Sequence, residues 1–139
     1  MTKKYLKYLQ EAIVHLKKSS KLGLKGKKTL CIDFDGVIHA YSKGYHDGTI
    51  YDKPMEGVQQ ALDILSKKYD LVCFSARINA GDAHGKKDMV EWLKNYDLLK
   101  YFIDITDKKI PCVAYIDDSA IRHTDWKSTF NELRRLEII

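Results

Sequence analysis

The stretch LCIDFDGVIH, residues 30–39, reads as a short apolar strand that runs into two aspartates and a glycine. Continuous apolar runs are typical of central parallel strands, which are covered on both faces. Asp33 and Asp35 therefore belong at or just beyond the carboxyl end of this strand, where open α/β sheets build their sites. Because side chains alternate along an extended chain, the two carboxylates should point to the same side and repel each other unless a cation or a proton separates them. Gly36 allows the chain to turn away after the strand.

The composition is that of an ordinary globular protein. The chain has 139 residues, of which 45% are hydrophobic and 31% charged, and this length favours one domain with a real core. No apolar run approaches the length of a membrane span, and the N-terminus lacks an apolar signal core. We therefore expect a cytoplasmic protein without membrane contact. Cys31, Cys73 and Cys112 stand in apolar, strand-like runs, so we expect three buried, reduced thiols.

The alternation of apolar segments along the chain predicts a parallel sheet. Strands are expected at 29–34, 69–74, 101–105 and 112–116, and helices at 56–68, 86–95 and 126–136. This order favours right-handed crossovers and an α/β, Rossmann-like fold. Residues 38–53, which include Gly44, Gly48 and several aromatic rings, are too few for a domain. We expect them to form a small hairpin or flap over the site, and we call them the flap.

Residues 1–27 are predicted to form a basic, amphipathic helical extension before a catalytic domain at 28–139. Residues 1–28 carry a charge of +8, which leaves −3 for the remainder of a chain whose net charge is +5. Apolar residues recur at helical spacing at Tyr5, Leu6, Leu9, Ala12, Ile13 and Leu16. We favour packing of this stripe on the body. Homo-oligomer formation through it, and binding of a nucleic acid by the lysines, are the alternatives.

Polar residues follow three of the expected strands. A parallel sheet brings the carboxyl ends of its strands to one edge, so these residues should meet at one mouth. They comprise four acids, one hydroxyl and one guanidinium, and two lysines stand just before the last strand: Asp33, Asp35, Asp117, Asp118, Ser75, Arg77, Lys108 and Lys109.

This set suits phosphoryl transfer through an aspartate. A carboxylate can attack phosphorus to give a phosphoaspartate, provided that its repulsion of the anionic phosphate is neutralised. Mg²⁺ prefers oxygen ligands, which Asp33, a backbone carbonyl near Asp35, and Asp117 can supply. Ser75 and nearby backbone N–H groups can bind phosphate oxygens, and a lysine can neutralise charge. Asp35 can protonate the leaving oxygen and later activate water.

The chain resembles phosphatases of the haloacid dehalogenase superfamily, in particular small bacterial and phage members. The four motifs of that family stand in order: DFDGV, the serine of CFSAR, a lysine before a short loop, and YIDD. Those small members likewise read DFDGVIH at the start and IDD-x-AI near the end. The match spans roughly residues 28–136 and leaves out the N-terminal extension. The gaps after the first two motifs are short, which implies no large cap domain and an open site covered only by the flap.

The resemblance assigns the catalytic roles. It implies that Asp33 is the nucleophile, Asp35 the general acid and base, and Ser75 the phosphate-binding hydroxyl. An acid at position 35 implies a phosphatase or phosphomutase, because dehalogenase members lack it and ATPase members carry threonine. Lys109 best matches the site lysine because it stands two residues before a proline, and Lys108 is the alternative.

The resemblance also implies a Mg²⁺ site and substrate contacts. The expected metal site comprises Asp33, Asp35, Asp117 and the acidic neighbour Asp118. The similar small members have arginine after the aspartate pair, where this chain has serine. Arg77 should point toward the mouth if the chain stays extended after Ser75, and it is expected either to contact substrate or to form a surface ion pair. The expected substrate contacts are Gly36, Ser75, Ala76, Arg77 and Lys109.

One rival function uses similar residues. Receiver-type phosphoacceptor modules also combine an aspartate, a hydroxyl, a lysine and an acidic pair around Mg²⁺. In receivers the acidic pair comes first in the chain, whereas here it comes last, which favours the phosphatase. The phosphorylated substrate stays open between a small molecule and a nucleic-acid end guided by the basic extension.

Overall fold

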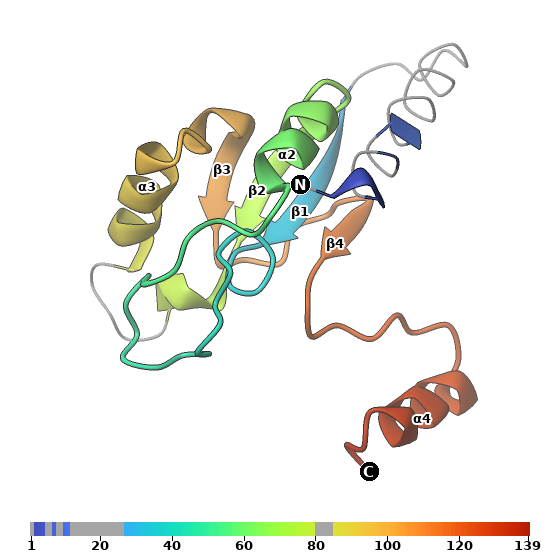
Figure 1. The fold of residues 1–139 in the computed structure, drawn as a ribbon. Coiled ribbons are helices and arrows are strands. Elements are labelled where there is room, and N and C mark those ends of the chain that lie inside the picture. The colour runs from blue at the N-terminus through green and yellow to red at the C-terminus, as the bar shows by residue number, and fades with distance from the viewer. Residues whose placement is uncertain (1, 5–6, 8–9, 12–26, 80–84) are drawn as a thin grey trace.

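The computed structural model describes residues 2–4, 7, 10–11, 27–79 and 85–139. Its centre is a four-stranded sheet in the order β3-β2-β1-β4, in which every pairing is parallel (Figure 1). The strands are β1 (Lys28–Asp33), β2 (Tyr69–Phe74), β3 (Phe102–Thr106) and β4 (Ala114–Ile116). This arrangement confirms the predicted α/β, Rossmann-like parallel sheet.

Strand β1 is central, between β2 and β4, as its apolar sequence predicts. Leu30, Cys31 and Ile32 are at most 7% exposed although their side chains alternate between the two faces. Ile32 pairs with Cys73 of β2 on one side and with Ile116 of β4 on the other. The carboxyl ends of these three strands therefore lie next to one another.

The helices form close to their predicted positions. They are α2 (Val58–Ser66), α3 (Gly85–Asn95) and α4 (Trp126–Arg135), with single 3₁₀ turns η1 (Ala76–Asn79) and η2 (Leu99–Tyr101). Helix α2 begins two residues later than predicted because Gly57, its N-cap, has a left-handed φ of 79°. Its Leu62 packs with Met89 and Leu93 of α3 in the main core. Helix α4 buries none of its residues, and Figure 1 shows it standing apart from the sheet.

Two predictions need correction near β4 and the cysteines. Strand β4 begins at Ala114 rather than at Cys112, although the N–H of Val113 already donates to the Thr29 carbonyl at 2.9 Å. Cys31 and Cys73 are buried in β1 and β2, but Cys112 precedes β4 and is only half-buried. The expectation of three buried thiols is therefore wrong for Cys112, while all three thiols are free.

The flap is a loop without regular strands. Its neck is closed by hydrogen bonds from the Ala40 N–H to the Lys53 carbonyl and from the Met55 N–H to the Ile38 carbonyl. The predicted N-terminal helix falls largely outside the described residues, as does its apolar stripe. No helix in the described ranges is long and apolar enough to cross a membrane.

Candidate active site

Three aspartates meet at the carboxyl edge of the sheet. Asp33 is the last residue of β1, and Asp117 and Asp118 directly follow β4. Because Ile32 and Ile116 are paired in a parallel ladder, the residues that follow them emerge side by side. One oxygen from each carboxylate lies within 4.8 Å of the others. For these three aspartates, the prediction that polar residues after separate strands lie together at one edge of the sheet is confirmed.

The three carboxylates of the trio lie close enough to repel one another. Burial and the nearby Asp117 carboxylate raise the pKa of Asp33 to about 7. The hydrogen bond that Asp33 Oδ1 accepts from the Phe34 N–H at 2.9 Å acts to lower this pKa but is outweighed. Ser119 fixes Asp117, since its N–H and its hydroxyl donate to Asp117 Oδ1 at 2.7 and 3.1 Å. Clustered carboxylate oxygens are the ligands that Mg²⁺ prefers, so the donor set fits this ion.

Gly36 makes room for the acidic trio. It has a φ of 81°, which L side chains rarely adopt. A Cβ placed on Gly36 would lie 2.1 Å from Asp118 Oδ2, so a side chain there would collide with that carboxylate. The turn itself is closed by the N–H groups of Ile38 and His39, which both donate to the Phe34 carbonyl at 2.9 Å. Glycine at this position therefore lets Asp118 lie directly against the turn.

Asp35 lies in a different environment from Asp33. His39 Nδ1 lies 2.8 Å from Asp35 Oδ1, and Arg77 donates from its NH2 group to Oδ1 at 2.9 Å and from Nε to Oδ2 at 3.0 Å. Burial acts to raise the pKa of Asp35, but these hydrogen bonds outweigh it and hold the pKa below its ordinary value. Among the described residues, the carboxylate of Asp35 does not belong to the clustered trio.

Ser75 and Arg77 lie where β2 ends, but the chain does not stay extended after Ser75. It enters η1 at Ala76, and the N–H of Arg77 donates to Ser75 Oγ at 3.1 Å. This turn directs Arg77 onto Asp35. The predicted surface ion pair is therefore an interior one, because the Arg77 side chain is only 8% exposed.

The two candidate lysines lie on the exposed loop before β4. Tyr115 holds that loop by donating its hydroxyl to the Ile110 carbonyl at 2.6 Å, and Lys109 Nζ lies 5.9 Å from the centre of the Tyr115 ring. The N–H of Lys108 donates to Thr106 Oγ1 at 3.1 Å. Within the described ranges, neither lysine forms an ion pair with an aspartate of the site. The assignment of Lys109 over Lys108 stays a prediction.

His39 is a site residue that the sequence reasoning missed. Its side chain is fully buried and contacts Asp35, four residues earlier. The signal in the sequence was a histidine placed directly after the apolar pair Val37 and Ile38, where a polar side chain needs a buried partner.

The fold and the site together define an α/β protein with a parallel sheet and an acidic cluster at its carboxyl edge. Comparison with known proteins found no matching family model, no matching curated protein and no matching solved structure.

Proposed function

We propose that this chain is a Mg²⁺-dependent phosphatase of the haloacid dehalogenase type, which hydrolyses a phosphomonoester through a phosphoaspartate on Asp33. The observation that carries the proposal is the convergence of Asp33, Asp117 and Asp118 to within 4.8 Å. The DFDGV and YIDD motifs that supply these aspartates support it. The test is steady-state release of phosphate from a generic aryl phosphate with Mg²⁺. A screen of phosphorylated metabolites and of 3′- or 5′-phosphorylated oligonucleotides would then identify the substrate class.

The mechanism assigns a task to each residue of the site. Asp33, Asp117 and Asp118, with the backbone carbonyl of Asp35, would hold Mg²⁺, which would neutralise charge between the phosphate and the nucleophile. An oxygen of Asp33 attacks phosphorus as the bond to the leaving oxygen breaks, and Asp35 delivers the proton to that oxygen. Water then attacks the same phosphorus, the bond from phosphorus to Asp33 breaks, and Asp35 takes the proton of the water.

The contacts of Asp35 favour its role in the second step. Three hydrogen bonds from His39 and Arg77 stabilise the ionised carboxylate, which is the form that accepts a proton from water. The first step needs little help from Asp35 when the leaving oxygen belongs to a phenol of low pKa.

The variant Asp35→Asn should therefore accumulate phosphoprotein. We expect near-normal attack on an aryl phosphate but breakdown of the phosphoenzyme slowed by about 100-fold or more, because the general base for water is lost. Rapid quenching after mixing with labelled substrate measures both steps. The matched control is Asp63→Asn, because Asp63 pairs with Lys67 on the exposed face of α2, and it should show no accumulation. Equal slowing of both steps in Asp35→Asn would argue against the acid–base assignment.

The variant Asp117→Ala should weaken Mg²⁺ binding by about tenfold or more, since one of three clustered carboxylates is lost. Ca²⁺ should inhibit the wild-type enzyme because its longer and looser coordination misplaces the nucleophile. Turnover measured against Mg²⁺ concentration gives the apparent affinity. Asp63→Ala is the charge-matched control, because Asp63 pairs with Lys67 on the exposed face of α2. Full activity in excess chelator would refute the metal site.

A further inference from the structure

Each of the two residues that hold Asp35 also holds the flap. His39 stands at the start of the flap, and its Nε2 accepts the N–H of Asp52, near the end of the flap, at 3.0 Å. Arg77 comes from η1, outside the flap, and its NH1 group donates to the carbonyl of Gly48 in the middle of the flap. Asp35 is therefore connected to the flap at two points, each through a single side chain.

The hydrogen bonds of His39 fix which nitrogen carries the proton. The N–H of Asp52 can only donate, so Nε2 must be the unprotonated nitrogen of the ring. Nδ1 then carries the hydrogen and donates it to Asp35. The ring is fully buried and packs against Phe34 and Trp92, with ring centres 5.6 Å away in both cases. The buried His39 ring therefore connects Asp35, to which Nδ1 donates, with Asp52, from which Nε2 accepts.

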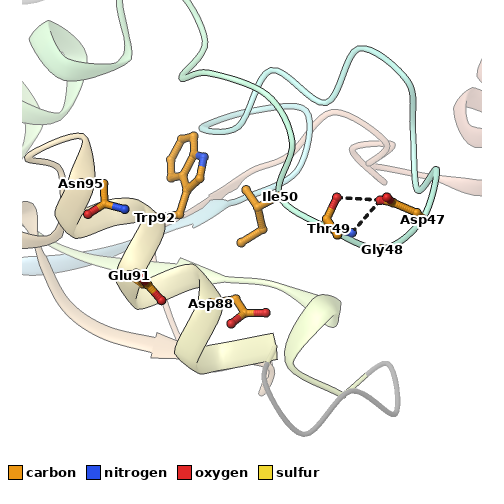
Figure 2. Close-up of a pocket in the computed structure, with 8 residues that line it drawn as sticks. All are labelled: Asp47, Gly48, Thr49, Ile50, Asp88, Glu91, Trp92 and Asn95. Carbon is orange, nitrogen blue, oxygen red and sulfur yellow. Dashed lines mark hydrogen bonds between the residues drawn. The ribbon is translucent and has the colours of Figure 1, made fainter.

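A cavity lies between the outer part of the flap and α3. Figure 2 shows residues 47–50 facing α3 across a cavity, with Asp88, Glu91 and Trp92 on the opposite wall. The cavity has a volume of about 300 Å³. The contact from Arg77 to Gly48 lies on this same stretch of the flap, so a polar link is made at the edge of the cavity.

We propose that Arg77 and His39 are positioning residues that join the flap to Asp35, so that the place of the flap and the orientation of this carboxylate are set together. Arg77 provides the strongest link, because its planar guanidinium binds both carboxylate oxygens and still reaches the Gly48 carbonyl. The consequence for turnover rests on the proposed function of Asp35. The structural link between Arg77, Asp35 and the flap does not depend on the proposed function.

Arg77→Lys tests the link, because lysine keeps the charge and loses the planar fork. We expect amide hydrogen exchange in residues 41–52 to accelerate roughly tenfold while exchange in β1 and β2 stays unchanged. We also expect kcat to fall roughly 10- to 100-fold with KM little changed, since Asp35 loses its orientation. Arg135→Lys is the matched control, because Arg135 pairs with Glu132 on the exposed surface of α4. It should change neither measurement.

The outcomes separate the possible roles of Arg77. A raised KM with unchanged kcat and unchanged flap exchange would make Arg77 a substrate contact and overturn the proposal. Faster exchange spread evenly over β1, β2 and the flap would make its role merely structural and would also overturn it. If the protein has no phosphatase activity at all, the proposed function fails, whereas the exchange measurement still decides the link.

The isosteric variant Asp35→Asn tests the same link from the other end and does not depend on Arg77→Lys folding. It removes the charge that holds the guanidinium, so exchange in residues 41–52 should again accelerate while β1 and β2 are unaffected. Unchanged flap exchange in this variant would overturn the proposal.

Discussion

Replacing Asp33 by asparagine is expected to reduce turnover of an aryl phosphate by about 10⁴-fold or more, because an amide cannot serve as the attacking nucleophile. The fold should survive, since Asp33 is the last residue of β1 and an amide oxygen can also accept the hydrogen bond that Asp33 Oδ1 accepts from the Phe34 N–H. Steady-state hydrolysis with Mg²⁺ measures the loss. Near-normal turnover in Asp33→Asn would remove Asp33 from the mechanism.

The same variant should make the metal-free protein more stable at alkaline pH. Asp33 has a pKa of about 7 in the folded protein, against an ordinary value of 3.8. Between these values the folded state keeps a proton that the unfolded state has lost, so the contribution of Asp33 to the free energy of unfolding falls as pH rises from about 4 to about 7. Asparagine cannot ionise and removes this loss.

Melting temperatures in chelator at pH 5 and pH 8 measure that effect. The gain of Asp33→Asn over the wild-type protein should be larger at pH 8, by a few degrees. The lowered pKa of Asp35 makes its own contribution to stability grow as pH rises. Asp35 is present in both proteins, so this contribution cancels from the difference between their melting temperatures. If Asp33→Asn changed the melting temperature equally at pH 5 and pH 8, ionisation of Asp33 would not destabilise the metal-free protein.

Gly36→Ala is expected to disturb the acidic trio without removing any of its carboxylates. The new Cβ would lie 2.1 Å from Asp118 Oδ2, so the carboxylate must move away from the trio. We expect Mg²⁺ affinity and kcat to fall together, by about 100-fold in kcat, since a misplacement of about 1 Å at a catalytic site costs this much. Isothermal titration with Mg²⁺ and steady-state kinetics provide the two readings.

Gly44→Ala is the matched control for Gly36→Ala. Gly44 also has a left-handed backbone, with a φ of 64°, but no heavy atom lies within 4 Å of a Cβ placed there. This control carries the backbone strain without the collision. If both alanine variants bind Mg²⁺ equally well, the position of the Asp118 carboxylate in the trio does not require a residue without a side chain at position 36.

The parallel sheet and the meeting of its carboxyl ends could be predicted from the sequence, because they depend on strand composition. The apolar runs that became β1 and β2 identify strands covered on both faces, and the parallel topology then places Asp33 beside Asp117. The segment 69–74 was predicted at its observed bounds. Gly36 was also predicted as a turn residue, although its closeness to Asp118 was not.

The surroundings of Asp35 could not be predicted in the same way. Alternation along a strand fixes the direction of a side chain only while the chain stays extended. After β1 the chain turns at residues 34–39, and this turn brings His39 back onto Asp35. After β2 the chain enters η1, and this turn brings Arg77 to the same carboxylate. Both contacts depend on loop geometry that a pattern of apolar and polar residues does not encode.

The most direct test of the proposed function is to trap the phosphoaspartate itself. The wild-type enzyme would be mixed with an aryl phosphate and Mg²⁺, quenched in acid and reduced with borohydride, which converts an acyl phosphate on aspartate to homoserine. Mass spectrometry of the digested protein should then find homoserine at position 33, dependent on both substrate and Mg²⁺. Phosphate release with no modification at position 33, or modification at another residue, would contradict catalysis through a phosphoaspartate on Asp33.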